Sequence, residues 1–125
     1  MIEFAQILQL YNAIVDGIGA LAGTRRRKGA AYEAALLRVY TAANESRSYI
    51  AGLKNRKQAD HTRETMIARL WSEAAVSLRK IDRKLADQCL VFGNTISEST
   101  RWSNAQVDAA RKLVTEIFEQ SRRLL

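Results

Sequence analysis

The sequence predicts an all-α protein, most simply an antiparallel four-helix bundle that forms one domain over residues 1–125. Its 125 residues include no proline and six glycines, so the residues that interrupt helices are scarce. Apolar residues recur at steps of three and four along most of the chain, which is the pattern of amphipathic helices. Hydrophobic residues make up 47% and charged residues 26% of the chain, a composition typical of globular proteins rather than disordered ones.

The first helix is predicted from about Ile2 to Ala22, followed by Gly23 as a C-terminal stop. Its apolar face comprises Phe4, Ile7, Leu8, Tyr11, Ile14, Val15, Ile18 and Leu21. The second helix is predicted from about Ala30 to Leu53. Its apolar positions alternate in steps of four and three, which favours packing at a shallow crossing angle; they are Tyr32, Leu36, Val39, Ala43, Ser46, Ile50 and Leu53.

The polar segment Lys54–Asp60 predicts a turn, with Asp60 or Thr62 available to cap the next helix. That third helix is predicted to be the longest, from about His61 to Val91. Its apolar stripe comprises Ile67, Leu70, Trp71, Ala74, Leu78, Ile81, Leu85 and Cys89.

The composition from Phe92 to Trp102 predicts a loop. The last helix is predicted to begin behind Ser103, because Ser103 and Gln106 match a capping box, and it continues to the C-terminus. Short connections between four such helices favour antiparallel neighbours.

The charge of the chain indicates a phosphate-bearing partner. The formal net charge is +7 and the sequence pI is about 10.0, a balance typical of nucleic-acid-binding domains. Two clusters dominate: Arg25, Arg26, Arg27 and Lys28 in a loop, and Arg79, Lys80, Arg83 and Lys84 on the predicted long helix. On a continuous helix the second cluster forms a patch one turn long, in which like charges four residues apart repel unless an anion compensates them.

Other interpretations of these clusters remain open. Either cluster suits a solvated face that favours solubility, or a docking surface for an acidic protein. Arg25 to Lys28 also follow a helix C-terminus, where cations interact favourably with the helix dipole without any ligand.

The segment from Arg56 to His61 has the spacing R-x-x-x-x-H. This spacing resembles the active-site motif of HEPN-type ribonucleases, which are small helical bundles. The resemblance implies that His61 would move a proton and that Arg56 would stabilise charge developing on a phosphate. It covers six residues, and Lys57 stands where the family often has asparagine or aspartate. The alternative is an exposed histidine at the start of a helix.

Cofactor and metal chemistry find no support in the sequence. His61 is the only histidine and Cys89 the only cysteine, so no zinc or iron ligand set is expected. Nucleotide-binding glycine motifs and the hydrolase G-x-S-x-G motif are also missing. Cys89 and Trp71 are expected in the core. Trp102 is expected either to pack on the last helix as a hydrophobic staple or to contact a partner.

These features together predict a non-enzymatic basic subunit that binds nucleic acid or serves a nucleic-acid-handling complex. The alternatives are a protein–protein adaptor that forms a homo-oligomer, with Leu37, Tyr40 and Trp102 as candidate partner contacts, and a HEPN-like ribonuclease. No cofactor and no small-molecule substrate are expected. Polar residues interrupt the first helix too often for a membrane span, and no secretory signal is evident. A cytoplasmic location is the resulting expectation.

Overall fold

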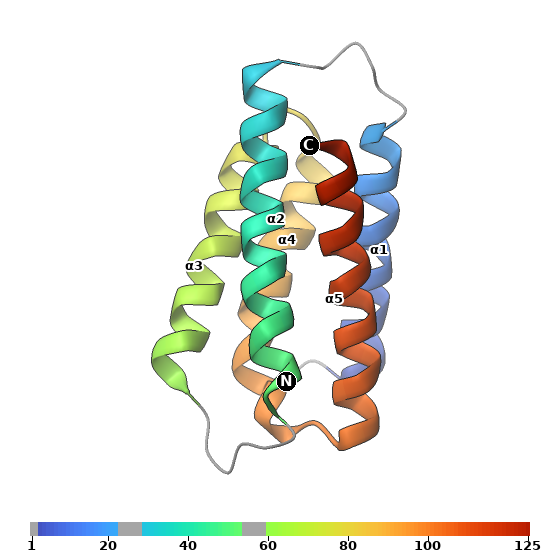
Figure 1. Ribbon diagram of the computed structural model, residues 1–125, viewed down its shortest axis with the longest axis vertical. Helices are drawn as coiled ribbons and strands as arrows, with labels where there is room; N and C mark the ends of the chain where they lie inside the picture. The colour runs from blue at the N-terminus through green and yellow to red at the C-terminus, as the bar shows by residue number, and fades with distance from the viewer. Residues whose placement is uncertain (1–2, 23–28, 54–59) are drawn as a thin grey trace.

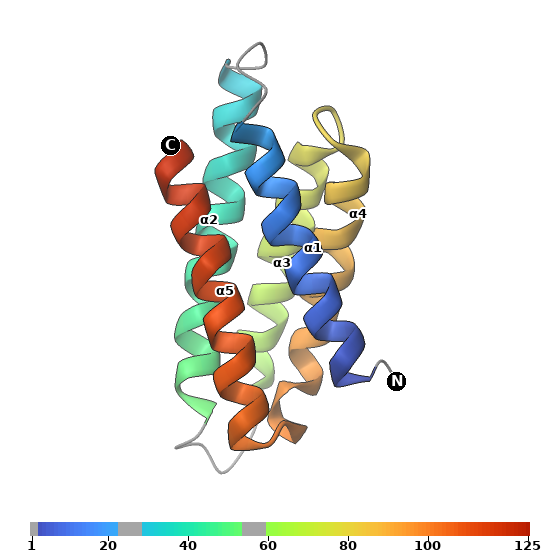
Figure 2. The same ribbon diagram turned by 90° about the vertical axis from the view of Figure 1, so that its right-hand side faces the viewer.

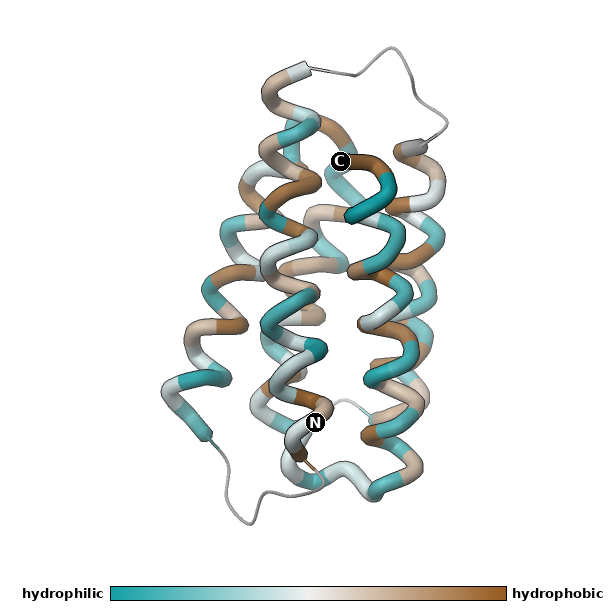
Figure 3. The backbone as a smooth tube through the Cα atoms, in the orientation of Figure 1, coloured by the Kyte–Doolittle hydropathy of each residue, from teal (hydrophilic) through white to brown (hydrophobic). Residues whose placement is uncertain are grey.

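The computed structural model describes residues 3–22, 29–53 and 60–125, which form five α-helices and one 3-10 helix and contain no strand. The elements are α1 (Phe4–Ala22), α2 (Ala30–Ala51), α3 (His61–Leu78), α4 (Arg83–Thr95), η3 (Ile96–Arg101) and α5 (Asn104–Leu124). The expectation of an all-helical protein is therefore confirmed. In Figure 3, hydrophobic and hydrophilic segments alternate along each helix, as amphipathic helices require.

The α-helices form a ring in which each one packs mainly against two others (Figures 1 and 2). α1 packs on α4 and α5, α2 packs on α3 and α5, and α3 also packs on α4. Helix direction alternates around this ring, except that α1 and α5 run in the same direction. An odd number of helices in a ring requires one such parallel pair. α1 and α2 are consecutive in the chain, yet α5 separates them in the ring.

The expected four-helix arrangement is wrong in its third element. The single helix predicted over His61–Val91 is instead an antiparallel hairpin of α3 and α4, with a turn after Leu78. Asp82 caps α4, and its carboxylate accepts a hydrogen bond from the Leu85 backbone N–H at 3.0 Å. The apolar stripe concealed this break because Leu78 and Leu85 face the same core on both sides of the turn.

The loop predicted over Phe92–Trp102 is also wrong. α4 continues to Thr95 and η3 follows it directly. Gly93 is buried within α4, where a Cβ would lie 2.7 Å from the Trp71 Cβ of α3. The glycine therefore allows the two helices to approach closely rather than marking the end of a helix.

One apolar cluster from all five α-helices forms the core. Its centre is aromatic: the Tyr11 and Phe92 rings stack with centroids 4.2 Å apart, and the Trp71 and Phe92 centroids are 4.5 Å apart. The buried Trp71 Nε1–H donates to the Ser46 Oγ of α2 at 2.8 Å. These contacts join α1, α2, α3 and α4, and the expected core positions of Trp71 and Cys89 are confirmed.

Two of the predicted helix starts are confirmed by their caps. The Asp60 carboxylate accepts from the Arg63 backbone N–H at 3.0 Å. Ser103 and Gln106 form the complete capping box at the start of α5. Both starts lie at the end of the bundle opposite the α3–α4 turn (Figure 1).

Candidate functional site

The basic residues Arg79, Lys80, Arg83 and Lys84 surround the α3–α4 turn rather than one turn of a continuous helix. Arg79 follows the last residue of α3, Lys80 lies in the turn, and Arg83 and Lys84 begin α4. All four side chains are exposed. The i,i+4 spacing expected from the sequence therefore does not describe their arrangement, although the four residues remain together at the tip of a hairpin.

These four cations have no carboxylate within 4 Å among the described residues. The carboxylate of Asp82, which directly precedes Arg83 in the sequence, accepts the N-terminal hydrogen bond of α4. Arg83 and Lys84 also begin a helix whose first turn contains no acidic residue. Because a helix N-terminus carries partial positive charge, it disfavours cations and favours a bound anion.

The C-terminus of α5 contributes two further arginines to this end of the molecule (Figures 1 and 2). Arg122 donates to the Glu119 carboxylate at 2.7 Å, and this hydrogen bond and charge raise the pKa of Arg122. Arg123 is exposed. We call this surface the basic end, which comprises Arg79, Lys80, Arg83, Lys84, Arg122 and Arg123. Glu33, in the first turn of α2, is an acidic residue on the same side.

Two short segments of the sequence account for the whole net positive charge of the chain. Of the 20 Lys and Arg residues, seven lie in segments 23–28 and 54–59, which contain no Asp or Glu. The remaining 13 basic residues equal the 13 acidic residues of the chain. Arg25, Arg26, Arg27 and Lys28 lie outside the described residues, but the end of α1 and the start of α2 lie at the basic end (Figure 2).

His61 lies at the opposite end of the bundle, at the start of α3. Its side chain is 86% exposed, and its Nδ1 lies 3.1 Å from the Glu64 Oε1. The Glu64 side chain is only 4% exposed, and its Oε2 accepts a 2.6 Å hydrogen bond from the Tyr49 hydroxyl of α2. Arg56, the other half of the R-x-x-x-x-H spacing, lies outside the described residues.

His61 and Glu64 line a cleft of about 260 Å³, which Asn94 and Ser97 also line. The sequence did not single out Glu64 or Tyr49 as site residues. The His61 and Glu64 spacing of three residues could have indicated the first contact, because such residues share one face of a helix. Nothing in the sequence indicates the Tyr49 contact, which depends on how α2 and α3 pack.

The three candidate partner contacts lie in different environments. Leu37 is 53% exposed and lines a cleft of about 330 Å³ between α2 and α3. The Tyr40 ring stacks on Phe118 of α5 with centroids 4.9 Å apart. The Trp102 ring packs edge-on against Phe4 of α1 at 5.3 Å. Both aromatic side chains are partly buried against the core, whereas Leu37 is exposed.

No group of three or more His, Cys, Asp or Glu side chains is placed to hold a metal ion within the described part of the chain. None of the described helices has the length and apolar character needed to cross a membrane. Comparisons with protein-family models, curated proteins and solved structures found no significant match.

Proposed function

We propose that this protein is a non-enzymatic helical-bundle subunit that binds nucleic acid, alone or within a nucleic-acid-handling complex, through the basic end. One observation carries the proposal. Arg79, Lys80, Arg83 and Lys84 are exposed together at the tip of the α3–α4 hairpin without a carboxylate partner among the described residues. Phosphate groups would neutralise this cluster and release counterions, which is the main source of sequence-independent affinity.

The local backbone supports the same function. The N-terminus of α4 presents partial positive charge beside Arg83 and Lys84, so a phosphate oxygen there would interact with the helix and with the side chains. Arg25, Arg26, Arg27 and Lys28 belong to this proposal as additional phosphate contacts, because they connect two helix ends that lie at the basic end.

The proposal can be tested with two double variants that remove the same charge from different surfaces. Arg79→Gln with Arg83→Gln alters the basic end, whereas Arg38→Gln with Arg69→Gln alters exposed positions on α2 and α3. Fluorescence anisotropy with a labelled oligonucleotide at low salt should show weaker binding for the first variant and near-parental binding for the second. Equal losses, or no binding by the parent chain, would refute a specific role for the basic end.

A HEPN-like ribonuclease is the second candidate, and the His61–Glu64 contact favours it. When Nδ1 carries the proton, it donates to Glu64 and leaves the Nε2 of His61 free to accept a proton from a substrate. RNA cleavage that is lost in His61→Ala would support this function. Cleavage that persists in His61→Ala, or its complete lack in the parent chain, would eliminate it.

A further inference from the structure

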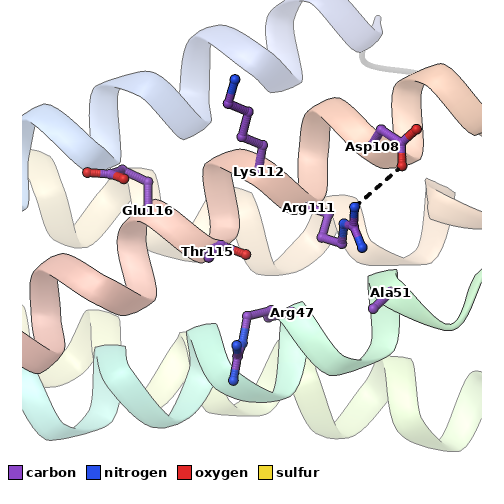
Figure 4. Close-up of a pocket in the computed structure, with 7 residues that line it drawn as sticks. All are labelled: Arg47, Ala51, Asp108, Arg111, Lys112, Thr115 and Glu116. Carbon is purple, nitrogen blue, oxygen red and sulfur yellow. Dashed lines mark ion pairs between the residues drawn. The ribbon is translucent and has the colours of Figure 1, made fainter.

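A second cationic surface lies between α2 and α5, on the flank of the bundle (Figure 4). It is a cleft of about 630 Å³, a volume within the usual range for small-ligand sites. The cleft is lined by Arg47, Ala51, Asp108, Arg111, Lys112, Thr115 and Glu116. Arg47 lies near the C-terminus of α2, at the opposite end of that helix from the basic end. We call this surface the Arg47 cleft.

The guanidinium of Arg47 is held in a defined position. Its Cζ lies 4.1 Å from the centroid of the Phe118 ring, which itself stacks on Tyr40. Its Nη2 donates to the Asn44 Oδ1 at 2.9 Å. Stacking of this kind supports the flat face of a guanidinium. Arg47 is therefore positioned in advance rather than free to rotate in solvent.

The charge of Arg47 has no counterion among the described residues, since none of their carboxylates lies within 4 Å of it. Its Nε is buried and has no hydrogen-bond acceptor in the described part of the chain. A partly buried cation without an ion pair is costly. The fixed position and the missing counterion together indicate a binding residue rather than a structural ion pair.

The α5 side of the cleft supplies complementary groups. In Figure 4, Arg111 and Thr115 lie on the side of α5 that faces Arg47, whereas Lys112 and Glu116 point away from it. Asp108 also lines the cleft, and its Oδ1 forms an ion pair with the Arg111 Nη2 at 3.8 Å, beyond hydrogen-bond distance. Arg47, Arg111 and Thr115 therefore line one cleft from two helices.

We propose that the Arg47 cleft binds a phosphate group between the guanidinium of Arg47 on α2 and the side chains of Arg111 and Thr115 on α5. Arginine suits this role because its paired N–H groups match two phosphate oxygens. The phosphate belongs either to a free nucleotide or to a nucleic-acid strand. This site goes beyond the proposed function, because it uses a different surface and does not require the basic end.

The direct test is an NMR titration of the ¹⁵N-labelled full chain with AMP and with inorganic phosphate, at constant ionic strength maintained with sodium chloride. Saturable shift changes are expected at the amides of Arg47, Arg111 and Thr115. A concentration of about 10 mM would largely fill a site of millimolar affinity. Neither ligand is expected to shift the amide of Arg69, which lies on α3 outside the cleft.

Substitutions identify which side chains bind the phosphate. Arg47→Met retains an apolar stem on Phe118 but should weaken phosphate binding about tenfold or more. Arg47→Lys should recover part of the affinity, because it restores the charge without the paired donors. Arg69→Met is the matched control and should bind as the parent does. If circular dichroism shows that Arg47→Met is unfolded, Arg111→Gln tests the same site from an exposed position and should also weaken binding.

The source of the phosphate is decided by a labelled single-stranded oligonucleotide. Binding of AMP that is lost in Arg47→Met assigns the cleft to free nucleotides. Oligonucleotide binding that Arg47→Met weakens and Arg69→Met does not, without AMP binding, assigns it to a strand. If neither Arg47 variant nor Arg111→Gln changes the affinity for any of these ligands, the site is refuted. Arg79→Gln with Arg83→Gln should leave AMP binding unchanged, so failure of the proposed function would be recognised separately.

Discussion

At the scale of single residues, the close approach of α3 and α4 depends on the missing side chain of a glycine. Gly93 of α4 lies against Trp71 of α3, and a Cβ there would meet the Trp71 Cβ at 2.7 Å. Neither atom can move without shifting a helix backbone. Gly19 of α1 provides the contrast, because a Cβ at that position would meet nothing within 4 Å.

The two glycines should therefore respond to alanine with opposite signs. Gly93→Ala is expected to lower the free energy of unfolding by about 1–3 kcal/mol, because it forces α3 and α4 apart. Gly19→Ala is expected to raise it by about 0.5–1 kcal/mol, since alanine favours an exposed helix. Urea denaturation followed by tryptophan fluorescence measures both. Equal effects would show that α3 and α4 do not approach closely at Gly93.

Cys89 shows how burial alone changes chemistry. Burial raises the pKa of its thiol to about 12, and the charge of Asp82 acts in the same direction. The thiolate is the reactive form, so alkylation by iodoacetamide at pH 8 should be slower in the folded chain than in urea by about two orders of magnitude. Mass spectrometry gives both rates. Comparable rates would place Cys89 at the surface.

The same shift predicts a loss of stability at high pH. The folded-state pKa of Cys89 lies above its ordinary value of 9.0, so the stabilising contribution is present below pH 9 and decreases as pH rises from about 9 toward 12. Burial raises the pKa of Tyr11 in the same way and adds to the decrease above pH 10. The melting temperature followed from pH 8 to pH 11 should fall, and a constant value would contradict this account.

At the scale of helices, sequence patterns located elements better than breaks. α1, α2 and α5 lie close to their predicted bounds, and the caps at Asp60 and Ser103 are the predicted ones. The α3–α4 turn was missed because a hairpin that folds back on one core preserves an apolar stripe across the reversal. A capping Asp82 followed by Leu85 was the available local signal, and it is weak inside an otherwise helical pattern.

Substitutions at Asp82 separate the contribution of the helix cap to stability from the effect of the negative charge on oligonucleotide binding. Asp82→Ala removes the hydrogen bond to the Leu85 N–H and should cost about 1 kcal/mol of stability. Asp82→Asn retains a capping oxygen and should cost less. Both variants remove a negative charge beside Arg83 and Lys84, so both should bind an oligonucleotide more tightly than the parent chain. If neither variant binds the oligonucleotide more tightly than the parent chain, phosphate contacts at this turn are contradicted.

The sequence predicts the exposure of the candidate site residues better than it predicts their arrangement in space. The exposure of Arg79, Lys80, Arg83 and Lys84 follows from composition, since charged residues in a polar run rarely become buried. Their placement around a turn depends on Asp82, and the Arg47 cleft depends on the packing of α2 on α5. Tyr49 and Glu64 likewise meet only when α2 and α3 pack. Contacts between distant segments leave no periodic signal in one sequence.

At the scale of the whole molecule, the five-helix ring determines which charges lie together. The parallel direction of α1 and α5 brings their C-termini to the end where the α3–α4 turn lies (Figure 2). Arg122 and Arg123 therefore join the four cations of the hairpin. The described helices and turns carry equal numbers of acidic and basic residues, so binding of a polyanion must arise from the distribution of charge rather than its total in this part of the chain.

The salt dependence of oligonucleotide binding tests this claim most directly. The logarithm of the association constant should fall linearly with the logarithm of the salt concentration. The slope reports phosphate contacts, about 0.7 for each on a single strand. Arg79→Gln with Arg83→Gln should reduce the slope by about 1.4, and Arg38→Gln with Arg69→Gln should leave it unchanged. Equal slopes for the parent chain and both double variants would contradict the account.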